Sequence, residues 1–375
     1  MKAFPEQEGG LLIQTVAVDY QQEFYRSLSE ATRGMTLLSG RRTFDRTIRA
    51  VVPSVPALEV RNVFLMGDRL LWQVGVLRPA LRAEWLIAEM NPRILSTWVL
   101  LACRRLLRRP TALWGHAFPR LGPDARTGVL RGPLRRIAHA VIVYSEREAL
   151  ALAERQPEIS VVAAPNALYR RADIRTPSTD PESVDGFICV GRLVEGKRPM
   201  LLLEAFSRLT PDADGHPVLH LVGEGPLEPL LRSRAEELGL DVSRVAFHGQ
   251  LSEREELREL YARAVASVSP GYVGLALIQS LSFGIPQIVA DCEPHSPEIA
   301  AADLGRNSVM FQAGSVEDLA RRLRELWSER TQWVAARHTI AEECASSYSV
   351  DVMAERMRDA LDLAATACKR SSAGL

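Results

Sequence analysis

The sequence predicts an α/β protein with two domains, each built on a parallel sheet. Short apolar runs alternate with amphipathic stretches from end to end, as in repeated β-α-β units. A chain of 375 residues also exceeds the size at which a single core is usual. A polar stretch with two prolines, RTPSTDPES at 175–183, interrupts the pattern and predicts a linker. We therefore expect domains over 1–178 and 179–345, followed by a C-terminal helix over 346–375 that can cross back to the first domain.

Strands and helices can be placed in both halves. A capping box formed by Ser145 and Glu148 predicts a helix that begins just after Ser145. Ser315 opens a second helix, with three leucines on one face, and a third follows Ser349 with the apolar stripe Val350, Met353, Met357 and Leu361. The strand-like runs are 11–17, 35–40, 83–90, 112–118, 139–145 and 159–166, then 186–191, 218–223, 245–249, 266–270, 286–291 and 308–311.

Composition predicts a folded, soluble, cytoplasmic protein. Apolar residues make up 47% and charged residues 25% of the chain, which is ordinary for a globular protein. The most apolar stretch, 94–103, is half the length of a membrane-spanning helix, and the N-terminus has no signal-peptide pattern. The five cysteines lack paired spacing, so we expect reduced thiols.

Charge is distributed unevenly along the chain. Residues 1–178 hold 26 Lys and Arg against 16 Asp and Glu, a net charge of +10, which leaves −10 for the remainder. One interpretation is that the two halves have solvated faces of opposite charge, which attract each other. The other is that the first half contacts an anionic membrane surface or a phosphate-bearing acceptor. Nucleic acid is disfavoured because no aromatic-interleaved basic stretch accompanies the charge.

Candidate ligand-binding residues follow the strands of the second half. Ligands of parallel sheets bind at the carboxyl ends of strands. The run 186–191 leads into Gly191, Arg192 and Lys197, which pair a permissive backbone with two cations that suit a diphosphate. The next strand ends in a tight loop that contains Gly223 and Glu224.

A glycine turn at 271–275 precedes another predicted helix. Helix N-termini preceded by glycines bind anions through free N–H groups. The turn matches neither the Gly-x-Gly-x-x-Gly dinucleotide pattern nor a Walker loop, so dehydrogenases and kinases are disfavoured.

Together these segments resemble the retaining glycosyltransferases of sequence family 4. The matching text is GFICVGRLVEGKRPMLLLEAF, LHLVGEGPLEPLL, VAFHGQL, GYVGLALIQSLSFGIPQIVAD and PEI, in order through about residues 186–330, with weaker matches in WGHAF, HAVIVYSE and APNAL before the linker. The resemblance implies the GT-B fold, in which two Rossmann-like domains face a central cleft. The domain over 1–178 would bind the acceptor, and the domain over 179–345 would bind the nucleotide sugar.

The resemblance also implies roles for individual residues. Arg192 and Lys197 would hold the donor pyrophosphate, and His116 would point toward the donor sugar. These three are the catalytic candidates. The donor-binding candidates are Gly191, Gly223, Glu224, Gly271, Tyr272, Val273, Gly274, Leu275, Gln279 and Glu298.

One departure from the family concerns its two glutamates, which are separated by seven residues. Here those positions hold Gly271 and Gln279. Gln279 can still bond a ribose hydroxyl, whereas Gly271 cannot replace a carboxylate, so sugar recognition must differ or the chain belongs to a divergent branch.

No metal or cofactor is expected. The sequence shows no metal-ligand spacing, and Asp212 and Asp214 fall in a turn at the wrong end of a strand. Catalysis would rest on fixed cations and a helix N-terminus that stabilise the departing nucleotide diphosphate.

The predicted function is retaining, metal-independent transfer of a hexose from a nucleotide diphosphate sugar to an acceptor hydroxyl, in surface polysaccharide or glycolipid synthesis. The acceptor is a sugar, a lipid-linked saccharide or a small molecule. The stretch 94–109, with Arg104, Arg105, Arg108 and Arg109 beside leucines, suggests peripheral contact with the inner membrane face. Alternatives are a natural-product glycosyltransferase, a sugar-nucleotide epimerase using His116, Glu298 and His295, and an inactive binding homologue.

Overall fold

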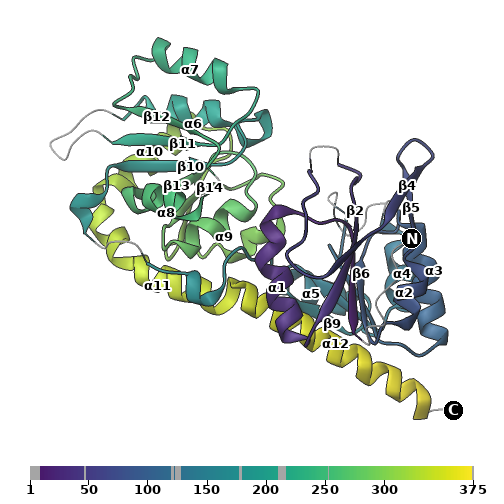
Figure 1. The fold of residues 1–375 in the computed structure, drawn as a ribbon. Coiled ribbons are helices and arrows are strands. Elements are labelled where there is room, and N and C mark those ends of the chain that lie inside the picture. Colours follow the sequence, from purple (N-terminus) through teal and green to yellow (C-terminus); the bar gives the residue numbers. More distant parts are fainter. Residues whose placement is uncertain are drawn as a thin grey trace. The chain divides into compact units, whose positions relative to one another are not determined.

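The computed structural model describes residues 9–45, 48–119, 122, 128–176, 180–209, 217–251 and 253–373, with side chains described up to residue 369. The chain divides into two compact units. Unit 1 comprises residues 1–168 together with 350–375, and unit 2 comprises residues 169–349 (Figure 1). Part of the predicted linker, 177–179, lies outside the described residues.

Unit 1 is built on a seven-stranded parallel sheet with the order β3-β2-β1-β6-β7-β8-β9. The strands are β1 (Gly10–Val16), β2 (Met35–Gly40), β3 (Ala57–Glu59), β6 (Leu86–Glu89), β7 (Thr111–Trp114), β8 (Ala140–Val143) and β9 (Val161–Ala163). An antiparallel hairpin of β4 (Arg61–Leu65) and β5 (Leu70–Val74) forms a separate small sheet.

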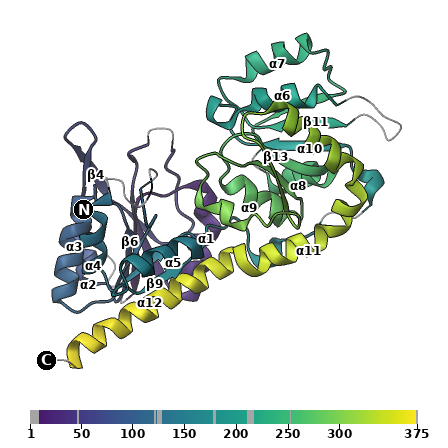
Figure 2. The same cartoon turned by 180° about the vertical axis from the view of Figure 1, so that it is seen from behind.

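Helices cover both faces of this sheet because successive strand residues point to opposite sides. Leu12 packs with α1 (Gln22–Ala31) and α12 (Val350–Ala373), and the two helices lie side by side (Figure 2). The predicted stripe of Val350, Met353, Met357 and Leu361 is buried in this core. The opposite face, which includes Leu11 and Ile13, packs against α2 (Leu77–Arg82), α3 (Leu95–Leu106), α4 (Arg131–Ile137) and α5 (Glu146–Arg155).

Unit 2 is built on a six-stranded parallel sheet with the order β12-β11-β10-β13-β14-β15. The strands are β10 (Gly186–Val190), β11 (Val218–Val222), β12 (Val245–Gly249), β13 (Ala264–Ser269), β14 (Gln287–Ala290) and β15 (Ser308–Phe311). The helices are α6 (Pro199–Phe206), α7 (Glu228–Glu237), α8 (Arg254–Arg263), α9 (Leu275–Ser282), α10 (Val316–Ser328) and α11 (Arg330–Tyr348). All six strands correspond to apolar runs found in the sequence.

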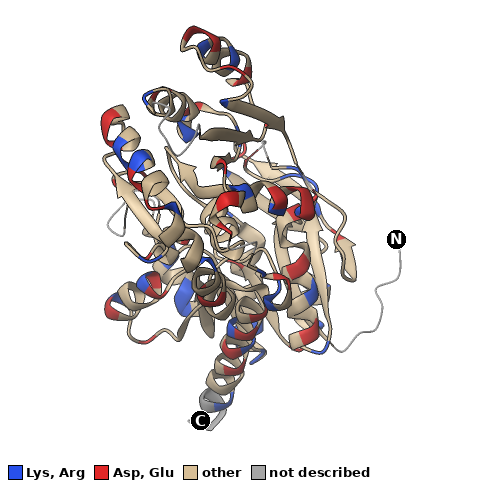
Figure 3. Cartoon of the chain, turned by 90° about the vertical axis from the view of Figure 1, so that its left-hand side faces the viewer, with Lys and Arg blue, Asp and Glu red and all other residues tan. Residues whose placement is uncertain are grey.

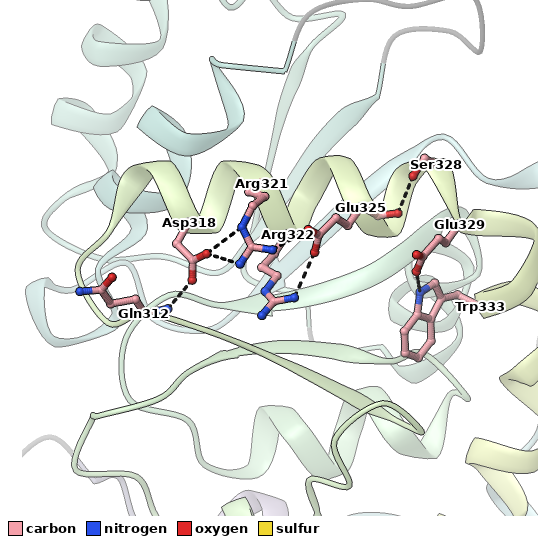
Figure 4. Close-up of polar contacts among 8 residues, drawn as sticks. All are labelled: Gln312, Asp318, Arg321, Arg322, Glu325, Ser328, Glu329 and Trp333. Atoms are coloured by element: carbon pink, nitrogen blue, oxygen red, sulfur yellow. Dashed lines mark hydrogen bonds and ion pairs between the residues drawn. The ribbon is translucent and has the colours of Figure 1, made fainter.

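Helix α10 illustrates how the sequence sets a boundary. The Ser315 hydroxyl accepts from the N–H of Asp318 at 3.1 Å, as expected for an N-cap. The Asp318 carboxylate in turn accepts from the N–H of Gln312 at 2.7 Å and pairs with Arg321 (Figure 4). Acidic and basic positions likewise follow one another along other helices (Figure 3).

Both sheets have one place where the strand order reverses, between β1 and β6 in unit 1 and between β10 and β13 in unit 2. Open parallel sheets bind ligands in the crevice at the carboxyl ends of the strands that flank such a reversal. The fold therefore offers one candidate crevice in each unit.

Candidate functional site

A pocket lies at the reversal in unit 2. It is lined by residues at the ends of β10 and β13 and at the start of α6: Cys189, Val190, Gly191, Arg192, Leu193, Lys197, Pro199, Ser269 and Pro270. Three of the sequence candidates, Gly191, Arg192 and Lys197, thus line one pocket.

The loops after β10 and β11 pack backbone to backbone beside this pocket. Leu193 N–H donates to the Glu224 carbonyl at 2.9 Å. Gly223 has a φ of +132°, and a Cβ at that position would lie 2.0 Å from the Gly191 carbonyl oxygen. Gly223 and the Glu224 backbone therefore fix the course of the β10 loop, while the Glu224 side chain is exposed.

The two cations of the pocket differ in exposure. Arg192 is exposed, and the described part of the chain offers it no ion-pair partner. Lys197 is half-buried, donates from Nζ to the Tyr272 carbonyl at 2.9 Å, and stands 3.7 Å from the centre of the Tyr272 ring. Burial lowers the pKa of Lys197, while Tyr272, Cys189 and Glu298 act in the opposite direction. Glu298 is itself buried, in the short helix η6 (Pro297–Ala301).

Gly271 faces backbone. A Cβ there would lie 2.3 Å from the Gly196 carbonyl oxygen and 2.8 Å from the Lys197 carbonyl carbon. The turn after β13 is therefore pressed against the short helix η5 (Glu195–Lys197), and no side chain fits between them. This packing gives a physical reason for glycine where the resembled family has glutamate.

His295 supports the turn from the other side. Its Nδ1 accepts from the N–H of Val273 at 3.0 Å, and its Nε2 lies 2.9 Å from the Ala290 carbonyl, which fixes Nε2 as the protonated nitrogen. The Val273 carbonyl accepts from Ser296 N–H at 2.9 Å. Sequence analysis considered His295 only as an acid–base candidate and missed this supporting contact.

The N-terminus of α9 presents backbone donors. Gly274 is the N-cap, and the N–H of Leu277 bonds back to its carbonyl at 3.0 Å. Among the residues that the structure describes, no acceptor is found for the N–H groups of Gly274, Leu275 and Ala276. Such groups, reinforced by the helix dipole, attract anions.

Gln279 lies within α9 and contacts two tyrosines. Its Nε2 donates to the Tyr169 hydroxyl at 3.0 Å, and its Oε1 lies 3.4 Å from the Tyr261 hydroxyl. Burial raises the pKa of Tyr169, so this phenol stays neutral. The Gln279 amide therefore has a structural role, and its contact with a ribose hydroxyl stays a prediction.

His116 belongs to unit 1, directly beyond β7. The predicted strand 112–118 ends at Trp114, so His116 is a loop residue. Its side chain is 51% exposed, its Nδ1 lies 3.5 Å from Glu148 Oε1, and its ring packs edge-on against Tyr144 at 4.7 Å. Glu148 is the capping-box glutamate of α5 and also accepts from Tyr144 N–H at 3.1 Å, so the predicted cap orients a candidate catalytic residue.

One part of the membrane hypothesis is wrong. Arg104 is fully buried: its Nε donates to Thr111 Oγ1 at 2.8 Å and its guanidinium also bonds the carbonyls of Ala83 and Pro110. Burial, with Arg109 nearby, lowers its pKa to about 10. Leu100 and Leu101 are core residues too. The exposed residues of this segment are Val99, Ala102, Arg105, Leu106, Leu107 and Arg108.

No cluster of three or more potential metal-ligating side chains occurs in the described ranges. Asp212 and Asp214 lie outside those ranges. Within the same ranges, no helix is long and apolar enough to cross a bilayer.

A family comparison matches this half of the chain. Residues 171–345 match the family described as glycosyl transferases group 1, which nearly coincides with unit 2. The match covers just under half of the chain, and it marks this segment as similar to that family. The pocket, its two cations and the α9 N-terminus all lie within the matched segment.

Two curated relatives are lipopolysaccharide 1,6-galactosyltransferases. The one from Salmonella typhimurium is 27% identical over 183 residues, covering 47% of this chain and 48% of the relative. The one from Escherichia coli K12 is 29% identical over 147 residues, covering 37% and 39%. The chain therefore aligns with about half the length of these relatives or less.

Solved structures match almost the whole chain. Anabaena Alr3699/HepE in complex with UDP aligns with a TM-score of 0.69 at 16% identity, covering 95% of this chain and all of that one. The apo form of the lipopolysaccharide outer core galactosyltransferase WaaB aligns with a TM-score of 0.64 at 16% identity, covering 94% and 99%. The predicted fold class is confirmed: the chain has the GT-B fold with two Rossmann-like domains.

Proposed function

We propose that this protein is a glycosyltransferase that moves a hexose from a UDP-sugar to a hydroxyl of a saccharide acceptor in lipopolysaccharide or surface polysaccharide synthesis. The observation that carries the proposal is the pocket at the β10–β13 reversal, where Arg192 and Lys197 lie at the strand end. The pocket and the α9 N-terminus both fall in the segment that is similar to glycosyl transferases group 1. The galactosyltransferase relatives favour galactose as the sugar, and the UDP-bound neighbour favours uridine as the base.

The chemistry of the pocket suits a diphosphate. Arg192 offers a planar fork of donors, and Lys197 offers a point charge. Helix α9 adds backbone N–H groups at the positive end of its dipole. Together they would stabilise the charge that develops on UDP as its bond to the anomeric carbon breaks. The acceptor oxygen then bonds to that carbon on the face that UDP leaves, and the acceptor proton departs with the diphosphate. This course retains the anomeric configuration and needs no metal.

His116 is the catalytic candidate from unit 1. Its contact with Glu148 holds the ring in place, while half of the side chain stays accessible. We propose that it contacts the donor sugar, as the family resemblance implies.

Sugar recognition cannot use a carboxylate at position 271. Gly271 is packed against the backbone of Gly196 and Lys197, so the hydroxyl contacts must come from other groups of the turn. The N–H of Val273 is not among them while it bonds His295. This leaves Gly274 and Leu275 as the backbone donors of the predicted set.

The epimerase alternative is weakened by one observation. Both ring nitrogens of His295 bond backbone groups, so this histidine cannot act as the second acid or base while the turn holds. A natural-product glycosyltransferase or an inactive homologue would use the same pocket, and these alternatives are separated by experiment.

A thermal-shift screen over UDP, GDP, dTDP and ADP tests the donor base. UDP at 100 times its dissociation constant should add about 2.7 kcal/mol of stability, and the other nucleotides less. Incubation with radiolabelled UDP-galactose then separates the activities: label on a saccharide supports the proposal, an isomerised donor indicates an epimerase, and binding alone indicates an inactive homologue.

We also propose peripheral contact of unit 1 with an anionic membrane surface. Arg105 and Arg108 flank Leu106, which is 84% exposed, and Leu107 at the end of α3. Apolar side chains next to cations are typical of interfacial attachment. This contact would place the enzyme where lipid-linked acceptors reside.

A further inference from the structure

The sheet of unit 1 has its own reversal, between β1 and β6, and none of the residues assigned above lies there. The register pairs Ile13 with Ala88, so Thr15 and Glu89 follow at the carboxyl ends of the two strands. In unit 2 the corresponding place is the pocket with Arg192 and Lys197. By the same rule for open parallel sheets, we expect a ligand crevice beside Thr15 and Glu89.

Glu89 is a carboxylate without a counterion at that crevice. Its Oε1 accepts from the N–H of Thr15 at 2.6 Å, and its Oε2 accepts a short hydrogen bond from the Thr15 hydroxyl. No cation pairs with it among the described residues, and the side chain is only partly exposed. Burial raises the pKa of Glu89, and the two bonds from Thr15 oppose that rise. A carboxylate in such surroundings costs stability unless its oxygens are satisfied.

Polar side chains from three elements hold Thr15, the partner of Glu89, and its chain neighbour Gln14 in place. Asn62 Nδ2 donates to the Thr15 carbonyl at 2.7 Å. Gln73 Nε2 donates to the Gln14 carbonyl at 3.2 Å, and the Tyr25 hydroxyl donates to Gln14 Oε1 at 2.7 Å. Networks of this kind fix the orientation of their members. The carboxylate is therefore presented in one orientation at the sheet edge.

The remaining hydrogen-bonding capacity of Glu89 defines what it can bind. A carboxylate accepts about four hydrogen bonds, and Thr15 supplies two. The remaining lone pairs of the carboxylate can only accept hydrogen bonds, so they suit hydroxyl donors. The negative charge would repel a phosphate or another carboxylate. A saccharide supplies neutral hydroxyls in the required number.

We propose that Glu89 is an acceptor-binding residue, which takes hydrogen bonds from the hydroxyls of a saccharide in the β1–β6 crevice of unit 1. The inference rests on the proposed function, because it names the group that orients the acceptor of that reaction. It assigns neutral sugar hydroxyls, and no anionic group, to this position.

The test compares wild type, Glu89→Gln and the matched control Glu158→Gln, an exposed glutamate of unit 1 that pairs with Arg136. The probe is core oligosaccharide released from a rough lipopolysaccharide. Saturation-transfer NMR reports its binding without donor, calorimetry reports UDP affinity, and slow hydrolysis of UDP-galactose reports donor chemistry with water as acceptor. We expect Glu89→Gln to raise the KM for the oligosaccharide about tenfold or more and to weaken its NMR signal, since bonds to charged groups are the strong ones.

UDP affinity and hydrolysis by Glu89→Gln should stay within twofold of wild type, and Glu158→Gln should match wild type throughout. An unchanged oligosaccharide KM in Glu89→Gln, or an equal loss of oligosaccharide transfer, UDP affinity and hydrolysis, would overturn the assignment. If Glu89→Gln does not fold, Glu89→Asp is the substitute. Its shorter side chain keeps the charge but moves the carboxylate back toward the strand, so it should show the same selective rise in the KM for the oligosaccharide. A wild-type protein that does not bind UDP would refute the proposed function, whereas one that binds UDP but gives no oligosaccharide signal would refute the Glu89 crevice alone.

Discussion

Replacing Gly271 with alanine tests whether the donor site depends on close backbone packing. The added Cβ would lie 2.3 Å from the Gly196 carbonyl oxygen, whereas real Cβ contacts essentially never fall below 3.0 Å. Helix η5 or the turn must therefore move by about 0.7 Å or more. Overpacking of this kind costs about 1–3 kcal/mol of stability.

The same displacement should move Lys197. This lysine belongs to η5, and its Nζ bonds the carbonyl of Tyr272, the residue that follows Gly271. Misplacement of a positioned group by about 1 Å can cost 100-fold in rate. We expect Gly271→Ala to lower turnover of UDP-galactose by about that factor and to weaken UDP binding. Gly271→Glu, which introduces the family's carboxylate, should be at least as damaging.

Turnover is measured by UDP release, affinity by calorimetry and stability by thermal unfolding. Gly196→Ala is the matched control, because its Cβ would only meet the Tyr272 ring at an ordinary 3.6 Å. Wild-type turnover and stability in Gly271→Ala, or an equal loss in both variants, would refute the packing argument.

Four further predictions follow from the same geometry. Arg192→Ala and Lys197→Ala should each lower turnover about 100-fold, the scale of one preorganised electrostatic donor, and near-normal rates in both would remove the diphosphate assignment. Activity should persist in excess EDTA; complete loss that magnesium or manganese restores would mean that a metal, rather than these side chains, neutralises the leaving group. Arg104→Gln should lower the free energy of unfolding by about 3 kcal/mol, because it leaves buried carbonyls without donors, and denaturant unfolding equal to wild type would contradict this. The double variant Arg105→Gln, Arg108→Gln should bind anionic vesicles more weakly with unchanged UDP affinity, and wild-type binding should fall as salt rises; vesicle binding equal to wild type would refute the membrane contact.

Most strands of the two parallel sheets could be predicted because they are short, mainly apolar runs. Each of the six apolar runs found in either half of the sequence became a strand, from β1 to β15. Strand β3 and the hairpin of β4 and β5 were missed. Their residues are mostly half-buried or exposed, so these segments lack a continuous apolar run. Apolar periodicity reports burial and cannot reveal strands that lie at a surface.

Residues of the candidate site were predictable where a strand end or a glycine turn marked them, as with Gly191, Arg192 and Lys197. Contacts that depend on packing between distant segments were not. Nothing in the local sequence shows that His295 accepts from Val273 or that Arg104 is buried beneath the carbonyls of unit 1. An arginine in a basic run suggests surface charge. Only the fold shows that the Arg104 guanidinium bonds the backbone carbonyls of Ala83 and Pro110.

We propose above that the segment similar to glycosyl transferases group 1 binds the diphosphate of a UDP-sugar at the β10–β13 reversal. A crystal structure of the protein with UDP tests it most directly. We expect phosphate oxygens within hydrogen-bonding distance of Arg192, Lys197 and the N–H groups at the start of α9. UDP bound elsewhere, or its phosphates held by a metal ion with both side chains turned away, would contradict it.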